Sequence, residues 1–353
     1  MDPAVLAGSP GDQDERDRNA VLSGFFACLV LATAGWWAAN QWLPDTAAVR
    51  LAGHAITIGD LHRRVFSTAL LLVFVIPTIF MIELYFVGWR RSSLRLLVVE
   101  HTPSSLTDLA CFLSWQARIM TVLTVVMSLG LALLSGTWVH ERLEALSGLS
   151  VSLANYPLPV QWVGFFLVYS FCDYWAHRLD HSPLFWPLHR FHHAADDFCV
   201  LNSVRTHPAV FTDLVAITLP AALCGVSPEV IIEVNFFVLT LRYLIHSRID
   251  SNWGWVGRWL LQSPTHHRLH HILDISQPVG HFGLMPLWDR LFGTWRGEAD
   301  QRLVIGVDKP YRHGAWLGPD LWRDYCEFWA GFRFKDRSAS GALAASQRIG
   351  VDA

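Results

Sequence analysis

The chain has 353 residues, of which 52% are hydrophobic and only 16% are charged, and its mean hydropathy is +0.30. A soluble enzyme usually carries about a quarter charged residues, so this deficit indicates a bilayer. The net charge of −3 provides no basic field to recruit nucleic acid. The six cysteines are scattered and include no CxxC pair, which excludes a disulfide framework and a thiolate zinc site.

Four apolar stretches predict membrane-spanning helices, at residues 21–43, 65–89, 119–139 and 160–175. A soluble core of buried helices is the weaker alternative, because the stretches contain so few charged residues. A shorter pair, residues 210–223 and 230–244, is broken by Gly225 and Pro228 and fits a hairpin or a re-entrant helix pair. We therefore expect an all-α integral membrane protein with four transmembrane helices and this short pair.

Basic residues near the span ends set the predicted sidedness. Arg90, Arg91 and Arg95 follow the second stretch and Arg118 precedes the third, so we expect the N-terminus and residues 90–118 to face the cytoplasm. The fourth span then returns the chain to the cytoplasm at His177. The predicted organisation is a cytosolic tail (1–20), membrane-anchor helices (21–159), a catalytic domain (160–296) and a polar, partly disordered C-terminal tail (297–353).

Twelve of the 17 histidines lie between His177 and His281, in spaced groups. The first group is His177 and His181, four residues apart, which places both imidazoles on one face of a helix. Asp173 precedes His177 by one turn, and we expect it to accept the outer N–H of a metal-bound histidine. Taken alone, such a pair is more often solvated than metal-bound.

The second and third groups repeat an HxxHH spacing. They are His189, His192 and His193, and then His267, His270 and His271, the latter following a Ser-Pro helix start. Neighbouring side chains diverge by about 100° around a helix, so adjacent histidines can serve two different metals. A single HxxHH pattern can arise by chance, but two such patterns with an HxxxH on the same membrane face indicate a metal centre.

Four more histidines are candidates. A ligand role is favoured for His246, at the end of the weaker apolar pair, whereas for His207 the ligand and structural interpretations have equal weight. His266 precedes the third group directly and is a further possible ligand. His281 is expected to line or support the site.

The number of histidines predicts two metal ions, since one ion needs three or four protein ligands and eight or more are present. Imidazole suits iron, zinc and copper alike. Attack on an unactivated C–H bond of a lipid requires a redox metal and O₂, which favours two iron ions with O₂ as co-substrate. By the affinity order, zinc can replace iron in purified protein.

The three histidine groups resemble the histidine boxes of the fatty acid hydroxylase / sterol desaturase superfamily. The resemblance covers roughly residues 160–296 and includes the segments at 173–178, 205–208 and 288–294. It implies a helical membrane protein whose cytosolic helical cap holds a dimetal site. The eight box histidines and His246 would be ligands, and a separate cytochrome b5-, ferredoxin- or reductase-type protein would supply electrons. Two positions depart from the family pattern: Arg242 stands where some members have histidine, and His281 where many have asparagine.

The predicted function is therefore O₂-dependent hydroxylation, or desaturation, of a lipid at the cytosolic face of a membrane. One alternative is a membrane zinc hydrolase, which needs a general base that the boxes do not contain as an HExxH glutamate. The other is a non-enzymatic metal-binding membrane protein, which would place histidines within spans or flexible tracts.

Overall fold

The computed structural model describes residues 10–51, 54–58, 61–129, 142, 145, 152–273, 280–298, 304–309, 311–313 and 317–332. The chain divides into two units, residues 1–101 and 102–353.

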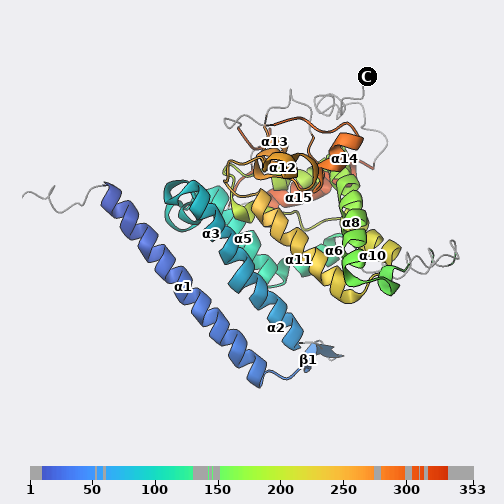
Figure 1. Cartoon of the computed structure of the whole chain (residues 1–353), viewed down its shortest axis with the longest axis horizontal. Coiled ribbons are helices and arrows are strands. Elements are labelled where there is room, and N and C mark those ends of the chain that lie inside the picture. Colours follow the sequence, from blue (N-terminus) through green and yellow to red (C-terminus); the bar gives the residue numbers. More distant parts are fainter. Residues whose placement is uncertain are drawn as a thin grey trace, which may run out of the picture. The chain divides into compact units, whose positions relative to one another are not determined.

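The first unit is a pair of long helical segments joined by a small sheet. Helix α1 (Pro10–Trp42) is followed by antiparallel strands β1 (Ala47–Leu51) and β2 (His54–Ile58), then by α2 (Leu61–Ala69), the π-helical segment η2 (Leu70–Val75) and α3 (Ile76–Val87). Helix α1 contacts α2 and η2, and Figure 1 shows it beside α2. The unit ends with η3 (Trp89–Arg91), α4 (Ser93–Arg95) and η4 (Leu96–Glu100).

Two features of this unit differ from the prediction. Residues 10–20 of the predicted tail belong to α1, and the β1–β2 hairpin lies in a connection expected to lack strands.

The one acidic residue of the second apolar stretch, Glu83, is fully buried and accepts hydrogen bonds from the backbone N–H and the hydroxyl of Ser93, each at 2.7 Å. A buried charge persists where such donors satisfy it.

Two described helical stretches are long and apolar enough to cross a membrane, Asp14–Trp42 and Leu70–Val87. Helices α5 (Pro103–Gln116) and α6 (Ile119–Met127) bend by 85° and provide a third if the pair is one span. Residues 130–139 of the predicted third span lie outside the described residues. The chain therefore has the apolar helices of a membrane protein. These helices do not establish the predicted number of four spans.

The second unit is helical in its described part and contains every histidine of the three boxes. After η5 (Leu153–Asn155) come the long helix α8 (Leu158–Asp180), α9 (Trp186–His193) and η6 (Val200–Val204). Then follow η7 (Leu214–Thr218), α10 (Leu219–Cys224) and α11 (Pro228–Ile245), and after them α12 (Gly254–Trp259), α13 (Pro264–His270), α14 (Pro286–Leu291) and α15 (Leu317–Ala330). Figure 1 shows α12, α13 and α14 gathered at one end of α8 and α11.

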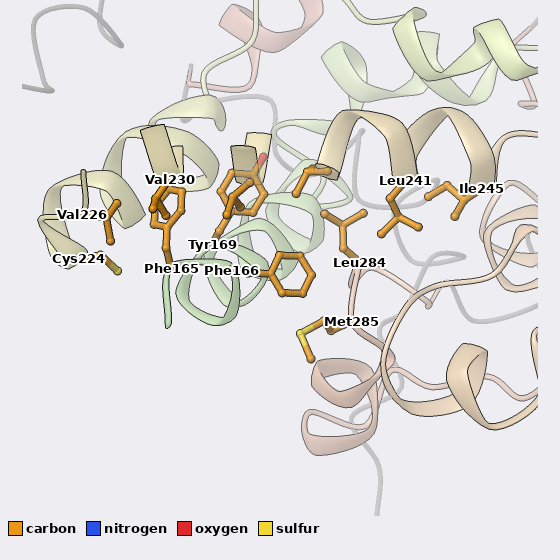
Figure 2. Close-up of a cluster of buried hydrophobic side chains, with 12 residues drawn as sticks. Phe165, Phe166, Tyr169, Cys224, Val226, Val230, Leu241, Ile245, Leu284 and Met285 are labelled. Atoms are coloured by element: carbon orange, nitrogen blue, oxygen red, sulfur yellow. The ribbon is translucent and has the colours of Figure 1, made fainter. Parts of the chain in front are cut away.

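Helices α8 and α11 pack through a continuous apolar cluster (Figure 2). From α8 it includes Phe165, Phe166 and Tyr169, and from α11 it includes residues spaced by three or four, from Val230 to Ile245. Each fully buried apolar side chain contributes about 1.5–3 kcal/mol relative to its exposed state. This packing holds the C-terminal ends of both helices together, where His177 and His246 lie.

The remaining predicted elements are present in altered form. The weaker apolar pair becomes η7–α10 and α11, separated by Gly225, whose φ of 52° ends α10 in the left-handed region that favours glycine. Part of the tail predicted to be polar and partly disordered is helical: α15 packs on α9 and buries Asp324 and Phe328. Residues 333–353 of the tail predicted to be partly disordered lie outside the described residues.

Candidate metal centre

Nine buried or half-buried histidines form two groups at the ends of α8 and α11. In each group, one nitrogen atom from every histidine lies within 4.8 Å of those from all the others. The five-histidine group contains His177, His181, His189, His193 and His270. The four-histidine group contains His192, His246, His267 and His271. These nine are the residues that the sequence predicts as metal ligands.

Sequence neighbours separate into different groups. His193 belongs to the five-histidine group and His192 to the four-histidine group, and the same division separates His270 from His271. Both pairs end short helices, α9 and α13, where successive side chains diverge by about 100°. The serine at the start of α13, Ser263, accepts a hydrogen bond from the backbone N–H of His266 and fixes where that helix begins.

Backbone carbonyls orient four of the nine rings through Nδ1. The pairs are His177 with Phe282 (2.8 Å), His192 with Arg205 (3.2 Å), His246 with Arg242 (2.6 Å) and His270 with Gly280 (2.8 Å). A carbonyl oxygen only accepts, so each Nδ1 carries the proton and each Nε2 presents a lone pair. This is the tautomer that binds a metal through Nε2.

The inward Nε2 atoms lie close together. Nε2 of His246 is 3.4 Å from Nε2 of His192, and both rings have their proton at Nδ1. In the five-histidine group, the buried Nε2 atom of His177 has no hydrogen-bond partner among the described residues. Two facing lone pairs repel unless a cation lies between them, and an all-imidazole set suits iron, zinc or copper. The residues present therefore fit a metal ion in each group.

Burial favours the neutral form of these rings. Desolvation lowers the pKa of all nine histidines below the ordinary value of 6.5, and the pKa of His246 falls to about 3. Metal binding requires deprotonated ligands. The site thus holds its ligands ready for a metal at neutral pH.

The outer partners correct the prediction for Asp173. The Phe282 carbonyl, and not Asp173, accepts the Nδ1–H of His177, because the Asp173 carboxylate forms an ion pair with Arg242 at 2.5 Å. The carboxylate nearest to a ring Nδ1 is that of Asp180, 3.7 Å from His189. That distance is too long for a hydrogen bond.

The three further candidate histidines lie outside both groups. His207 bonds the Leu321 carbonyl through Nε2 (2.9 Å) and accepts the Ala209 N–H at Nδ1 (3.0 Å), which is a structural role. The rings of His266 and His281 stack on each other, with centroids 5.3 Å apart, beside Trp295. Both nitrogens of His207 are occupied by backbone groups, and the other two rings support α13 from outside the centre.

Sequence reasoning missed a carboxylate behind each group. Behind the four-histidine group, Asp108 on α5 forms a fully buried ion pair with Arg205 (2.6 Å), whose carbonyl bonds His192. Behind the five-histidine group, Asp289 accepts the Phe282 N–H, the Gly283 N–H and the hydroxyl of Thr294. The carboxylate of Asp289 thereby fixes the loop whose carbonyls orient His177 and His270.

These two carboxylates differ in how far sequence could reveal them. Asp289 belongs to the 288–294 segment already singled out by resemblance, although its role was not deduced. Asp108 lies 97 residues before its partner, and no local pattern marks it. Gly283 has a similar hidden constraint, since a Cβ there would lie 2.6 Å from the Met285 carbonyl and 3.0 Å from Asp289 Oδ2.

A cavity of about 160 Å³ adjoins both groups. His177 and His189 of the five-histidine group and His192, His246 and His267 of the four-histidine group line it. Apolar side chains cover much of the remaining wall, among them Phe185, Leu188, Val210, Phe211, Ile245 and Leu284. Histidines of both groups therefore border one space.

Comparison with known proteins agrees with the geometry. Residues 162–294, which include all nine histidines, match the model of the fatty acid hydroxylase family. The part of the chain that holds the candidate metal centre is therefore similar to fatty acid hydroxylases. Its homologues are enzymes of the fatty acid hydroxylase / sterol desaturase superfamily.

Individual relatives are similar to this chain over part of their length. Human alkylglycerol monooxygenase is 29% identical over 160 residues, which are 43% of this chain and 34% of that protein. The alkylglycerol monooxygenase of Xenopus tropicalis is 29% identical, with the same coverage. C-4 methylsterol oxidase of Schizosaccharomyces pombe is 28% identical over 38% of this chain and 49% of that protein. The chain thus spans between a third and a half of these relatives, and no solved structure matches it significantly.

Proposed function

We propose that this protein is an O₂-dependent lipid hydroxylase whose two histidine groups hold two iron ions at a membrane face. The observation that carries the proposal is the pairing of the two groups on one cavity: nine neutral imidazoles converge as two sets, and five of them line the same space. The similarity to lipid monooxygenases and sterol oxidases supports a lipid as substrate.

The reaction expected of such a centre inserts one oxygen atom into a C–H bond. The lipid C–H becomes C–OH, and the second oxygen atom of O₂ leaves as water, with two electrons and two protons supplied from outside. When bound, the iron pair provides the O₂ activation that imidazole and carboxylate side chains do not. A cytochrome b5-, ferredoxin- or reductase-type protein is the proposed source of electrons.

The chain's own residues position and protect this chemistry. Backbone carbonyls hold the imidazoles in one tautomer, and the buried Asp108 and Asp289 hold those carbonyls. The apolar wall formed by residues such as Leu188, Phe211 and Leu284 excludes water and accepts hydrocarbon. These roles need no movement of the ligands during the reaction.

The proposed placement is multi-pass, with the centre facing the cytoplasm. Apolar helices long enough to cross support membrane insertion, and the arginines at 90, 91 and 95 support this sidedness. On α8, exposed apolar side chains recur at three- or four-residue intervals from Val160 to Leu179, as expected of a helix side that contacts lipid. A lipid substrate would then enter the cavity from the bilayer.

The decisive experiment combines metal analysis with isotope incorporation. The full chain, purified anaerobically in lipid nanodiscs and loaded with iron, is given reductant, a membrane lipid extract and ¹⁸O₂. We expect about two iron ions per chain and one ¹⁸O atom in a hydroxylated lipid. In His246→Ala the iron should fall to about one ion per chain and the ¹⁸O product should be lost, because His246 belongs to the four-histidine group. His313→Ala should retain both, because its ring lies outside both groups. No O₂ consumption by the iron-loaded protein with any lipid would refute the proposal. An alkene product without ¹⁸O would instead identify a desaturase, and lipid hydrolysis by the zinc-loaded form a hydrolase.

A further inference from the structure

Trp186, the first residue of α9, contacts three histidines of the five-histidine group. Its ring centroid lies 5.1 Å from that of His181, 5.3 Å from that of His193 and 6.3 Å from that of His189. The side chain is only half-buried, so the same indole also reaches the surface. Trp186 therefore connects buried histidines with solvent through one aromatic ring.

The other aromatic side chains that touch the nine histidines, within the described part of the chain, are phenylalanines. Phe282 lies against the five-histidine group and Phe198 against the four-histidine group. A phenyl ring gives up an electron far less readily than an indole does. Of these aromatic neighbours, Trp186 is thus the one that can be oxidised and reduced again.

The helix that carries the ligands also holds the indole against them. Trp186, His189 and His193 are spaced by three and four residues, which places them on one face of α9. Arg190, from the same helix, donates from Nε to Asp324 of α15 at 3.1 Å, and both of these side chains are buried. The position of the indole relative to the two α9 ligands is therefore fixed by a helix that is itself anchored.

An O₂-activating centre needs a source of electrons when its cavity holds no lipid. With no C–H bond in reach, the nearest groups that can be oxidised are the histidines themselves and Trp186. Oxidation of a histidine ring would damage a metal ligand. An indole loses an electron more readily than an imidazole, so Trp186 would be oxidised first.

We propose that Trp186 is a redox relay that supplies electrons to the centre when no substrate is bound, an inference that rests on the proposed hydroxylase function. In each transfer the indole loses one electron to the oxidised iron centre and its Nε1–H proton to solvent, which leaves an indolyl radical. A small reductant such as ascorbate or a thiol then returns one electron, and solvent returns the proton. Two transfers consume the two unused oxidising equivalents, and the second oxygen atom of O₂ leaves as water after taking up two protons.

The test supplies the oxidising equivalents directly, as hydrogen peroxide added to the iron(III)-loaded full chain in nanodiscs of one synthetic phospholipid. Electron paramagnetic resonance of freeze-quenched samples, with and without deuterated tryptophan, identifies a tryptophan radical. Peptide mass spectrometry locates oxidised tryptophan and histidine, and iron content is recorded for every sample.

Three variants separate redox chemistry from packing. Trp186→Phe keeps an aromatic ring that is hard to oxidise, and Trp186→Tyr restores a ring that can be oxidised. Trp295→Phe is the matched control, because Trp295 lies beside His266 and His281, which belong to neither metal-binding group.

We expect a tryptophan radical in the unmodified chain and in Trp295→Phe, and its loss in Trp186→Phe at equal iron content. Oxidation of His181, His189 and His193 should rise several-fold in Trp186→Phe and fall again in Trp186→Tyr. In the unmodified chain, oxidation among the 17 tryptophans should concentrate at Trp186. This last measurement needs no variant, so it tests the relay even if a Trp186 variant binds less iron.

A radical that persists in Trp186→Phe, equal histidine oxidation in all variants, or tryptophan oxidation concentrated elsewhere would overturn the inference. A purely structural role would lower the iron content of Trp186→Phe and Trp186→Tyr alike and leave Trp186 unoxidised in the unmodified chain. If the radical and the protection of the histidines are seen with peroxide while no lipid is hydroxylated with O₂, the proposed hydroxylase fails and the relay stands. Lipid hydroxylation without either sign would mean the reverse.

Discussion

Removing the carboxylate of Asp108 should empty the four-histidine group while leaving the five-histidine group occupied. Both Asp108 and Arg205 are fully buried, and the Arg205 guanidinium also donates to the Ser104 and Ala194 carbonyls. In Asp108→Ala the guanidinium keeps its charge and loses its counter-ion. Arg205, whose backbone carbonyl holds His192, then keeps only the hydrogen bonds to Ser104 as its side-chain anchor to α5.

The magnitude follows from the burial of the pair. Breaking a buried ion pair by removing one partner costs about 3–5 kcal/mol. At about 2–4 °C per kcal/mol for a unit of this size, the melting temperature should fall by roughly 6–20 °C. Loss of the outer partner of a metal-bound histidine lowers metal affinity about 10–100-fold, so the metal content should fall from two per chain toward one.

The assay is metal analysis and thermal unfolding of the purified full chain, with Asp196→Asn as control because that carboxylate is 72% exposed. Combining Asp108→Ala with His246→Ala should remove no further metal, since both act on the four-histidine group. Combining it with His270→Ala should remove the rest. Equal metal loss in both combinations, or a melting temperature unchanged by Asp108→Ala, would refute this account of the outer network.

Four further predictions follow from the same geometry. Asp289→Asn should lower the metal content of the five-histidine group, so its metal loss should add to that of Asp108→Ala. A double variant that loses no more metal than either single variant would contradict separate outer networks for the two groups. His192→Ala and His193→Ala should each leave about one metal per chain and together leave none, by mass spectrometry of the metal. Metal-free protein should lose stability as pH falls below about 6.5, because histidines of the unfolded chain become protonated there while the buried histidines of the folded chain stay neutral; a melting temperature independent of pH between 7.5 and 5 would contradict this prediction. Replacing iron with zinc should restore the melting temperature of chelator-treated protein but not O₂ uptake, and uptake with zinc would exclude redox catalysis by iron.

The nine metal-binding candidates were predictable because their spacing is local. Residues four apart meet on one helix face, so each HxxHH pattern brings its first and last histidines into one group. His246 was found through its position at the end of an apolar segment and through resemblance. The division of the nine into groups of five and four was not predictable, since it depends on how α8, α9, α11 and α13 pack.

The outer residues show where local reasoning ends. Asp173 lies one turn from His177 and was expected to orient it, yet Arg242 from another helix competes for the carboxylate and a distant loop carbonyl replaces it. Asp108 supports His192 from 84 residues away in sequence. The β1–β2 hairpin was missed because its sequence lies in a connection between apolar helices, where hydropathy carries no strand signal. The misses at Asp173 and Asp108 concern contacts set by tertiary packing.

Helices α9 and α13 each contribute histidines to both groups. The distance between the two proposed metal positions therefore depends on the backbones of these two short helices. His192 and His193 are covalent neighbours, as are His270 and His271, so neither metal position can move away without deforming one of these backbones. Motions of the connecting loops would alter access to the cavity and leave this spacing unchanged. In the proposed dimetal centre, the two ions would therefore stay at one separation.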